Sequence, residues 1–245
     1  MSNQPWFLVP RTSWGGSEVT LPPDESRHAL KVLRVSPPDV ITVTDGAGAV
    51  ARCAAARIDD GLLVAEILET DQRRPPLPEV AVYQGAAKGG KVDGVIERLA
   101  EMGVAETGVF SSERSVVRWD EAKGERLAER WDAIARSTAK QSRSPFVMRT
   151  GKPLSWDRLL ARIANEQATV VLWEEASLPL RTALHGPPER IALVIGPEGG
   201  FTREEAEALA DAGGQLVSLG PRILRTENAP IVSVAAVLYH YGLIG

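Results

Sequence analysis

Three short, uniformly apolar runs in the C-terminal half constrain the fold more than any other feature of this chain. They are TVVLW at 169–173, IALVI at 191–195 and QLVSL at 215–219. Runs of this length without polar alternation are typical of strands buried on both faces, as parallel strands are. Helical patterns lie between or after them, and AVYQGA at 81–86 is also followed by one, which ends at Gly103. The alternation predicts an α/β fold with a mostly parallel sheet.

The N-terminal part has a different pattern, with short β-type runs and one helix. The runs lie at 6–9, 40–44, 50–55 and 62–68. Two of them flank Asp45-Gly46, which is a strong signal for a hairpin turn. A helix is expected to begin near Asp24 and to continue through Arg34. This part is therefore expected to form a small β-barrel or sandwich with one helix.

A stretch rich in proline and arginine, DQRRPPLPE at 71–79, separates the two patterns. Prolines at this density stiffen a chain and interrupt regular structure. We therefore expect an N-terminal domain of residues 1–72, a linker of residues 73–78 and a C-terminal domain of residues 79–245.

The composition argues against membrane and metal sites. The longest apolar runs are far shorter than the roughly 20 residues that cross a bilayer. The N-terminus has no export-signal pattern, so we expect a cytoplasmic protein without a membrane partner. Cys53 is the only cysteine, and the three histidines are scattered along the chain. We therefore expect neither a disulfide nor a bound metal.

The charge distribution is compatible with a nucleic-acid partner, although the net charge is -4. Between Arg130 and Lys152 the chain has six basic residues against one acid. Attraction to phosphates is screened within about 10 Å, so it acts locally. An acidic protein with one concentrated basic segment can therefore bind a polyanion there.

The apolar run IALVI ends directly at a glycine-rich segment, GPEGGF at 196–201. In α/β sheets, ligands bind beyond the carboxyl ends of strands, and glycine lets backbone N–H groups approach a ligand closely. Thr202 and Glu205 then form a capping-box pattern, which predicts the start of a helix. Taken alone, the glycines are explained somewhat better by a tight strand-to-helix turn that needs glycine for its geometry than by a ligand loop.

The next strand ends in a second loop, GPRILRTENAP at 220–230. It carries four polar side chains, namely Arg222, Arg225, Glu227 and Asn228. Adjacent polar loops at one sheet edge are how a small-molecule pocket is built, so the two loops together favour a ligand site. The helix that follows has an apolar stripe, Ile231, Val234, Ala235, Leu238 and Tyr241. That stripe suits packing within the domain or an interface between two copies.

Four segments resemble the signature regions of the 16S ribosomal RNA uridine N3-methyltransferases, a family of the SPOUT class. They are IGPEGGFT, LGPRILRTENA, KGGKVDGVIERLAEMGV at 88–104 and STAKQSRS at 137–144. The resemblance implies a PUA-like barrel followed by a methyltransferase domain with a deep trefoil knot. It implies S-adenosylmethionine as the cofactor and uridine 1498 of 16S ribosomal RNA, within the 30S subunit, as the substrate. It also implies a homodimer whose active site uses both chains.

The resemblance carries over to particular positions. The residues expected to hold the methyl donor are Leu172, Gly196, Pro197, Glu198, Gly199, Gly200, Leu219, Gly220, Ile223, Leu224, Arg225 and Asn228. The residues expected to bind RNA are Arg11, Arg27, His28, Lys31, Arg34, Lys88, Arg136, Lys140 and Arg143. Two positions depart from the family's usual pattern, since Asn228 replaces a threonine and Lys140 replaces an acid.

Methylation of uridine N3 requires loss of the imide proton while the carbonyl oxygens gain negative charge. Arginine suits their stabilisation because it stays charged and donates in a plane, so Arg225 is the first candidate and Arg143 the second. Glu198 or Glu227 could accept the proton, although acids near helix starts usually complement the helix dipole. Other readings stay open, namely an RNA-binding protein of the same fold without catalysis, a methyltransferase for another RNA base and an enzyme for a small nucleotide.

Overall fold

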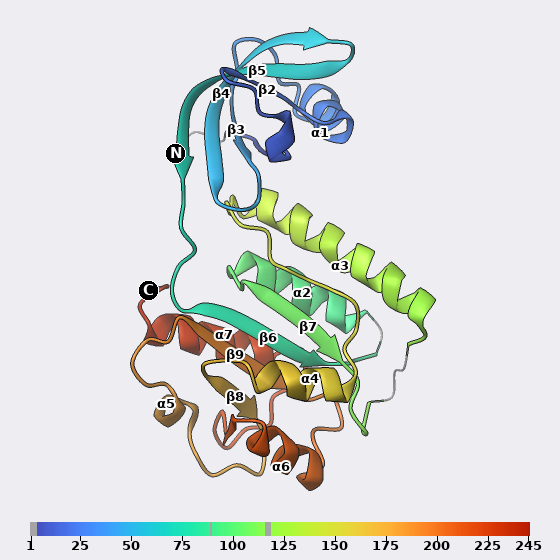
Figure 1. Cartoon of the computed structure of the whole chain (residues 1–245), viewed down its shortest axis with the longest axis vertical. Coiled ribbons are helices and arrows are strands. Elements are labelled where there is room, and N and C mark those ends of the chain that lie inside the picture. Colours follow the sequence, from blue (N-terminus) through green and yellow to red (C-terminus); the bar gives the residue numbers. More distant parts are fainter. Residues whose placement is uncertain (1–3, 89, 116–118) are drawn as a thin grey trace. The chain divides into compact units, whose positions relative to one another are not determined.

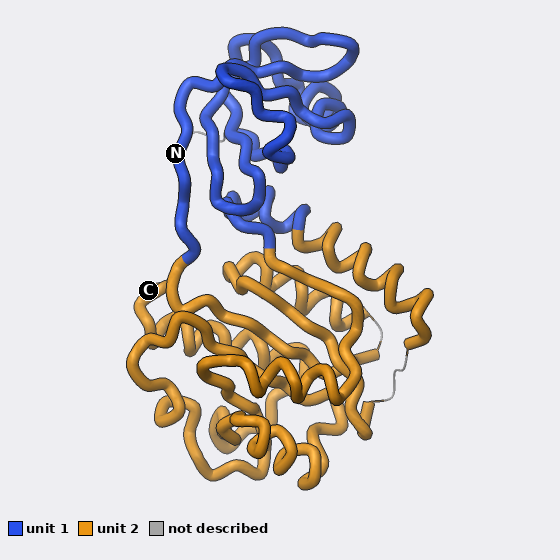
Figure 2. Tube along the Cα trace, in the orientation of Figure 1, with its two compact units in different colours: residues 1–75, 136–147 blue, residues 76–135, 148–245 orange. Residues whose placement is uncertain are grey.

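The computed structural model describes residues 4–88, 90–115 and 119–245 (Figure 1). The chain forms two compact units, which Figure 2 colours separately. Unit 1 comprises Met1–Pro75 and Arg136–Val147, and unit 2 comprises Pro76–Ala135 and Met148–Gly245. The basic segment Arg136–Val147, which lies within the predicted C-terminal domain in sequence, thus belongs to unit 1.

Unit 1 contains a five-stranded sheet in the order β1-β3-β4-β5-β2. Its strands are β1 (Trp6–Leu8), β2 (Glu18–Thr20), β3 (Val40–Thr44), β4 (Ala49–Asp59) and β5 (Leu62–Gln72). β1 is parallel to β3, and the other neighbours are antiparallel. Phe7, Ile41, Cys53 and Leu63 lie in its buried core. The four predicted β-type runs are confirmed, and β2 is an additional strand.

The predicted turn at Asp45-Gly46 is confirmed, because β3 and β4 pair antiparallel on either side of it. Asp45 Oδ1 accepts hydrogen bonds from the backbone N–H groups of Ala47, at 2.8 Å, and Ala49, at 3.0 Å. Gly46 has a φ of 77°, in the left-handed region that favours glycine. Asp45 therefore stabilises the turn by hydrogen bonds, and Gly46 allows its backbone conformation.

The predicted helix from Asp24 to Arg34 is present, but its geometry changes along its length. It comprises α1 (Pro23–Arg27) and a π-helical turn, η2 (His28–Val32), and the unit also has a short 3-10 turn, η1 (Arg11–Ser13). Lys140, from the segment Arg136–Val147, places its Nζ atom 2.5 Å from Glu25 Oε1, whose side chain is buried. This ion pair ties the segment to α1.

Unit 2 contains a second five-stranded sheet, in the order β10-β8-β9-β6-β7. Its strands are β6 (Glu79–Gly85), β7 (Glu106–Phe110), β8 (Thr169–Leu172), β9 (Arg190–Ile195) and β10 (Gly214–Val217). Every neighbouring pair is parallel. Val170, Val171, Leu193 and Val194 are at most 1% exposed, so the central strands are covered on both faces. The predicted α/β fold with a mostly parallel sheet is confirmed.

Helices cover both faces of this sheet. They are α2 (Lys91–Glu101), α4 (Trp156–Ile163), α5 (Leu180–Ala183), α6 (Arg203–Asp211) and α7 (Ala229–His240). The longest helix, α3 (Glu121–Gln141), begins in unit 2, where Trp131 bonds to Asp93 of α2, and its last residues belong to unit 1. α2 and α7 pack together, and α7 lies against β6 and β9 (Figure 1). α4 and α6 pack on the other face, where Leu159, Ile163 and Leu209 meet Val171 and Val194. The sheet is thus the middle layer of three.

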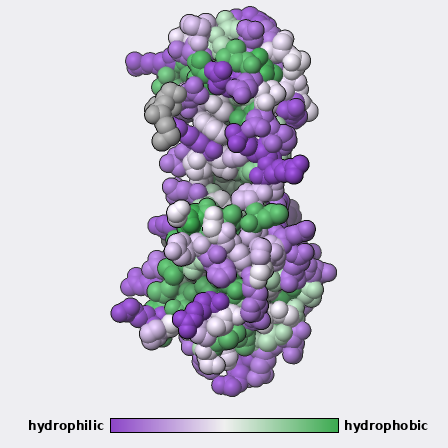
Figure 3. Space-filling model, turned by 90° about the vertical axis from the view of Figure 1, so that its left-hand side faces the viewer, coloured by the Kyte–Doolittle hydropathy of each residue, from purple (hydrophilic) through white to green (hydrophobic). Residues whose placement is uncertain are grey.

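Some large apolar side chains remain at the surface. Figure 3 shows patches of apolar residues among polar ones on one face of the molecule. Among the exposed large hydrophobic residues are Val32, Ile223, Val232 and Tyr239. Val232 and Tyr239 are both on α7, whose Val234 and Leu238 are buried within unit 2.

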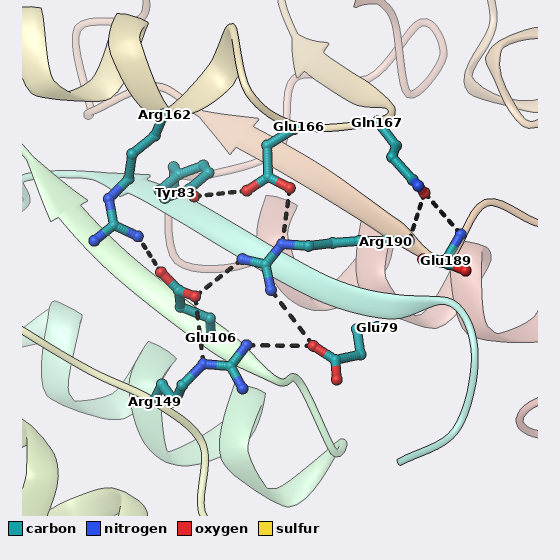
Figure 4. A network of polar contacts seen from close by, with 9 residues as sticks. All are labelled: Glu79, Tyr83, Glu106, Arg149, Arg162, Glu166, Gln167, Glu189 and Arg190. Atoms are coloured by element: carbon teal, nitrogen blue, oxygen red, sulfur yellow. Dashed lines mark hydrogen bonds and ion pairs between the residues drawn. The ribbon is translucent and has the colours of Figure 1, made fainter. Parts of the chain in front are cut away.

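An ion cluster lies where β6, β7 and β9 begin (Figure 4). Its members are Glu79, Glu106, Arg149, Arg162, Glu166 and Arg190. Arg190 lies at the centre, with Nη2 3.0 Å from Glu106 Oε2 and Nε 2.7 Å from Glu166 Oε2. Burial alone would raise the pKa of Glu106, but Arg190, Arg162 and Arg149 outweigh it and hold the pKa below its ordinary value. The cluster therefore links the first residues of β6, β7 and β9 by ion pairs.

Candidate active site

A cleft of about 710 Å³ lies at the carboxyl edge of the parallel sheet, opposite the ion cluster. The loops around it follow β8, β9 and β10, which end at Leu172, Ile195 and Val217. Apolar walls come from Leu172, Ile195, Leu219 and Leu224. The volume falls within the roughly 300–1,000 Å³ that small-molecule sites occupy. The cleft therefore lies where ligands bind in sheets of this kind.

The glycine-rich loop after β9 forms one wall of the cleft. Gly200 has a φ of 67°, and a Cβ atom on it would lie 2.5 Å from Glu174 Oε1. A Cβ atom on Gly196 would lie 3.3 Å from the carbonyl carbon of Gly200. Side chains are therefore excluded at positions 196 and 200, where the loop presents backbone to the cleft. The turn requires glycine for its geometry and also lines a cavity, so both readings of the sequence hold.

The start of α6 fixes the end of this loop. The Thr202 hydroxyl accepts from the Glu205 backbone N–H at 3.1 Å, and Glu205 Oε2 accepts from the Thr202 N–H at 3.0 Å. The predicted capping box is thus confirmed. Arg114 also holds the loop, since its Nη1 donates to the carbonyl oxygens of Gly199, at 3.1 Å, and Phe201, at 3.2 Å.

Thr226 joins the two loops. Its buried hydroxyl donates to the carbonyl oxygen of Gly196 at 2.7 Å and accepts from Gln84 Nε2 at 2.8 Å. Gln84 is the penultimate residue of β6, so the Thr226 side chain connects β6 with the loops after β9 and β10. The turns at 196–200 and 220–228 therefore form one crevice.

Most of the residues predicted to hold the methyl donor line this cleft. Those that do are Leu172, Gly196, Pro197, Glu198, Gly200, Leu219, Gly220, Ile223, Leu224 and Arg225. Gly199 and Asn228 are not among the lining residues. The Gly199 carbonyl oxygen is bound by Arg114, and Asn228 precedes the first residue of α7.

The two candidate acids converge on one lysine. Lys91 Nζ, at the start of α2, lies 3.3 Å from Glu198 Oε1 and 3.5 Å from Glu227 Oε2. Burial tends to raise the pKa of Glu198, but hydrogen bonds from the backbone N–H groups of Lys88 and Glu198 and from Lys91 lower it below the ordinary value. A carboxylate held in its charged form by several donors is a weak base. Glu198 is therefore better suited to fixing the loop than to accepting a proton.

The candidate arginines occupy different units. Arg225 lines the cleft in unit 2, as does Arg222. Arg143 belongs to the segment of unit 1, where it has a φ of 57°. Within one chain, Arg225 is thus the predicted catalytic arginine that the structure places at the cleft.

The residues predicted to bind RNA also divide between the units. All except Lys88 lie in unit 1, where Arg27, His28, Lys31 and Arg34 are exposed along and after α1 and η2. Arg11 stacks over Trp14, with its guanidinium carbon 4.5 Å from the ring centroid. Lys140 pairs with Glu25, as described above. Lys88 is exposed in unit 2 and lines a smaller, second cleft.

Several residues at the cleft were not predicted. Trp173 and Glu174 directly follow β8, and that position beyond a strand end was a usable signal. Thr226 lies within the LRTE segment, but the sequence gives no sign that its hydroxyl bonds to Gly196 and Gln84. Lys91 and Arg114 reach the loop from more than 80 positions away in the sequence, and no local pattern indicates such contacts.

Two negative findings apply to the described part of the chain. None of its helices combines the length and apolar character required to span a bilayer. None of its His, Cys, Asp and Glu side chains gather in groups of three or more that could hold a metal ion.

Comparisons with known proteins agree with this architecture. A family model described as an RNA methyltransferase domain matches residues 73–238, and one described as an RNA methyltransferase PUA domain matches residues 21–68. The first match covers most of unit 2, including its cleft, together with the segment Arg136–Val147, and the second lies within unit 1. The N-terminal sheet is therefore a PUA domain.

Individual relatives match nearly the whole chain. Ribosomal RNA small subunit methyltransferase E of Mycobacterium bovis is 34% identical over 235 residues, which covers 94% of this chain and 90% of that protein. The protein of the same name from Bacillus subtilis is 32% identical over 229 residues, covering 90% of each. The crystal structure of the Neisseria gonorrhoeae protein of that name, bound to S-adenosylmethionine, has a TM-score of 0.86 at 30% identity, covering 97% of this chain and 98% of its own. The chain therefore belongs to the ribosomal RNA small subunit methyltransferase E family.

Proposed function

We propose that this protein transfers a methyl group from S-adenosylmethionine to N3 of a uridine in 16S ribosomal RNA, namely uridine 1498. The observation that supports this most is the single crevice that the loops after β9 and β10 form at the carboxyl edge of the sheet. Family membership supports the reaction class, and the crevice supports our choice of its location within this chain.

The residues present fit the cofactor. The wall at Gly196 and Gly200 exposes backbone where a side chain would fill the space, and Leu172, Leu219 and Leu224 offer apolar surface for the adenosine part. When bound, S-adenosylmethionine supplies an electrophilic methyl group. The chain's own contribution is then to orient the uridine and to stabilise the charge that develops on it.

Arg225 is the residue that we assign to charge stabilisation, because it lines the crevice with a permanent positive charge. Glu227 is the stronger candidate for accepting the N3 proton, since Glu198 is held by Lys88 and Lys91. Glu227 Oε2 is buried, lies 3.5 Å from Lys91 Nζ and makes no hydrogen bond to any described residue. The proton would pass from uridine N3 to that carboxylate.

We assign RNA binding outside the crevice to unit 1, with Arg27, His28, Lys31 and Arg34 as the main contacts. Their exposure along one short helical segment supports this assignment. Phosphate contacts of this kind position the RNA without reading its sequence. A base can leave its stack for the crevice at a cost of a few kcal/mol, which such contacts would offset.

We further propose that the protein is a cytoplasmic homodimer with the trefoil knot of its family, and that it acts on the 30S subunit. The exposed Val232 and Tyr239 on α7 supply apolar surface that a second copy would cover. Analytical ultracentrifugation tests the dimer, and Tyr239→Asp is expected to shift it toward the monomer. A monomeric wild-type protein at micromolar concentration would contradict this part.

Nucleoside mass spectrometry tests the activity. Ribosomal RNA from cells without this gene should lack one 3-methyluridine, and the purified protein with S-adenosylmethionine should restore it on 30S subunits from those cells. Calorimetry should show cofactor binding to the protein alone. Binding without any methyl transfer would indicate an RNA-binding protein, and methylation of another base would contradict the assigned substrate.

A further inference from the structure

The second cleft of unit 2 has a composition that suits a nucleic-acid ligand. It encloses about 370 Å³ between the start of α2 and the residues from Trp119 to Trp131. Six side chains that line it carry the argument, namely Lys88, Asp93, Trp119, Lys123, Arg130 and Trp131. The volume is at the lower end of the range for small-ligand sites, which suits one nucleotide.

The aromatic part of the cleft is rigid. Trp131 is 1% exposed, and its Nε1 atom donates to Asp93 Oδ1 at 3.1 Å. Trp119 meets it edge to face, with ring centroids 6.4 Å apart and planes at 84°. Trp119 is only partly buried, so part of its ring remains available. An aromatic surface held in this way is suited to stacking against a base.

The rim of the cleft is positively charged. Asp93 is compensated by Arg130, whose Nη2 lies 2.5 Å from Asp93 Oδ2. Lys88 and Lys123 are exposed, and neither ammonium group forms an ion pair with any residue that the structure describes. Two uncompensated cations beside an indole are the combination that binds a nucleotide through its phosphate and its base.

The second cleft adjoins the crevice. The backbone N–H of Lys88 donates to Glu198 Oε1 at 3.1 Å, and Glu198 lines the crevice. Lys91 lines the crevice as well, whereas Lys88 and Asp93 on either side of it line the second cleft. The turn that begins α2 thus forms the partition between the two cavities.

We propose that the second cleft binds a nucleotide of the substrate RNA that flanks the methylated uridine. Its base stacks on Trp119, and its phosphate lies between Lys88 and Lys123. This inference rests on the proposed function, because it assumes that the target uridine enters the adjoining crevice. Under this proposal, unit 2 contributes to recognising the RNA around the methylated uridine, in addition to unit 1.

Steady-state kinetics on 30S subunits that lack the modification test this subsite. Trp119→Ala is expected to raise the KM for the subunit roughly tenfold, because it removes one base stack. The kcat and the Kd for S-adenosylmethionine should stay within twofold of wild type, and Trp119→Phe should restore most of the affinity. Lys123→Gln should raise the KM for the subunit. It should also lower the slope of log KM against log salt by about 1, the value expected for the loss of one phosphate contact.

Arg126→Gln is the matched control, because Arg126 is an exposed cation on the same helix that lines neither cleft. Its KM should stay within twofold of wild type. If Trp119→Ala and Lys123→Gln also keep the wild-type KM while methylation proceeds, the subsite is wrong and the proposed function stands. If the wild-type protein methylates no ribosomal RNA, the proposed function fails and the subsite fails with it.

Discussion

The Thr226 hydroxyl donates a 2.7 Å hydrogen bond to the carbonyl oxygen of Gly196, and this contact joins loops that are 30 positions apart in the sequence. The same hydroxyl accepts a hydrogen bond from Gln84. One buried oxygen atom therefore holds β6 and the two loops of the crevice together. A change at this atom should therefore affect both stability and cofactor binding.

Thr226→Val removes the hydroxyl with little change in shape. We expect a loss of about 1–3 kcal/mol in the free energy of unfolding, because Gly196 and Gln84 lose a buried hydrogen-bond partner. The Kd for S-adenosylmethionine should rise roughly tenfold in calorimetry. Thr182→Val is the control, since Thr182 is an exposed threonine whose hydroxyl donates to the nearby carbonyl oxygen of Pro179. Equal behaviour of the two variants would contradict the role of Thr226.

Gly200→Val places a β-branched residue at a φ of 67° and directs its Cβ atom at Glu174. Such residues are strongly disfavoured in the left-handed region, so the loop must change its path. We expect cofactor affinity to fall by on the order of tenfold or more, with methyl transfer lost in parallel. Gly151→Val should have little effect, because a Cβ atom on Gly151 meets open space. Intact cofactor binding and methyl transfer in Gly200→Val would exclude this loop from the site.

Arg225→Gln removes the positive charge that we assign to the uridine carbonyl oxygens. Loss of one such stabilising group typically lowers kcat by roughly 100-fold to 1,000-fold. Single-turnover measurements with saturating cofactor should show this decrease, and Arg225→Lys should recover only part of the rate. Arg181→Gln, an exposed change on α5, serves as the control. A normal single-turnover rate in Arg225→Gln would remove Arg225 from the reaction.

Glu106 should make stability depend on pH at the acidic end. Its folded-state pKa is lowered, so the stability it contributes is present above its unfolded pKa, about 4.3, and is lost as pH falls through the folded pKa. Glu106→Gln should cost on the order of 3 kcal/mol at pH 7, because Arg162, Arg190 and Arg149 lose a partly buried partner.

Urea unfolding between pH 8 and pH 3.5 measures this effect. The difference between wild type and Glu106→Gln should stay constant down to about pH 5 and narrow below about pH 4.3. Glu125→Gln breaks an exposed pair with Lys152, 2.9 Å apart, and should leave the free energy of unfolding almost unchanged, because water screens exposed pairs. A difference for Glu106→Gln that widens toward acid would contradict the assigned direction.

The sequence predicts strands well where one signal dominates. Val40–Thr44, Thr169–Leu172 and the run 191–195 within β9 are apolar or β-branched, and burial decides their structure. β7 (Glu106–Phe110) is different, because Gly108 at its centre interrupts the pattern of a strand. The structure requires glycine there, since a Cβ atom would lie 2.9 Å from the side chains of Tyr83 and Leu154. That demand comes from packing, which a local pattern does not record.

The site divides in the same way. Its glycines and Arg225 stand in recognisable segments, so their positions could be predicted. The contacts of Lys91 and Thr226 span 107 and 30 positions of sequence, and only the order of strands in the sheet brings them together. The membership of Arg143 in unit 1 likewise depends on packing between distant segments.

The ion cluster around Arg190 stands at the opposite end of the strands from the crevice. The ion pairs that link the amino ends of β6, β7 and β9 are therefore far along the strands from the loops that line the crevice. The loop at 218–228 can therefore change in evolution without disturbing the ion pairs at the other end of the sheet. Conversely, a mutation at the cluster should lower the amount of active enzyme in a cell without altering which nucleotide is modified.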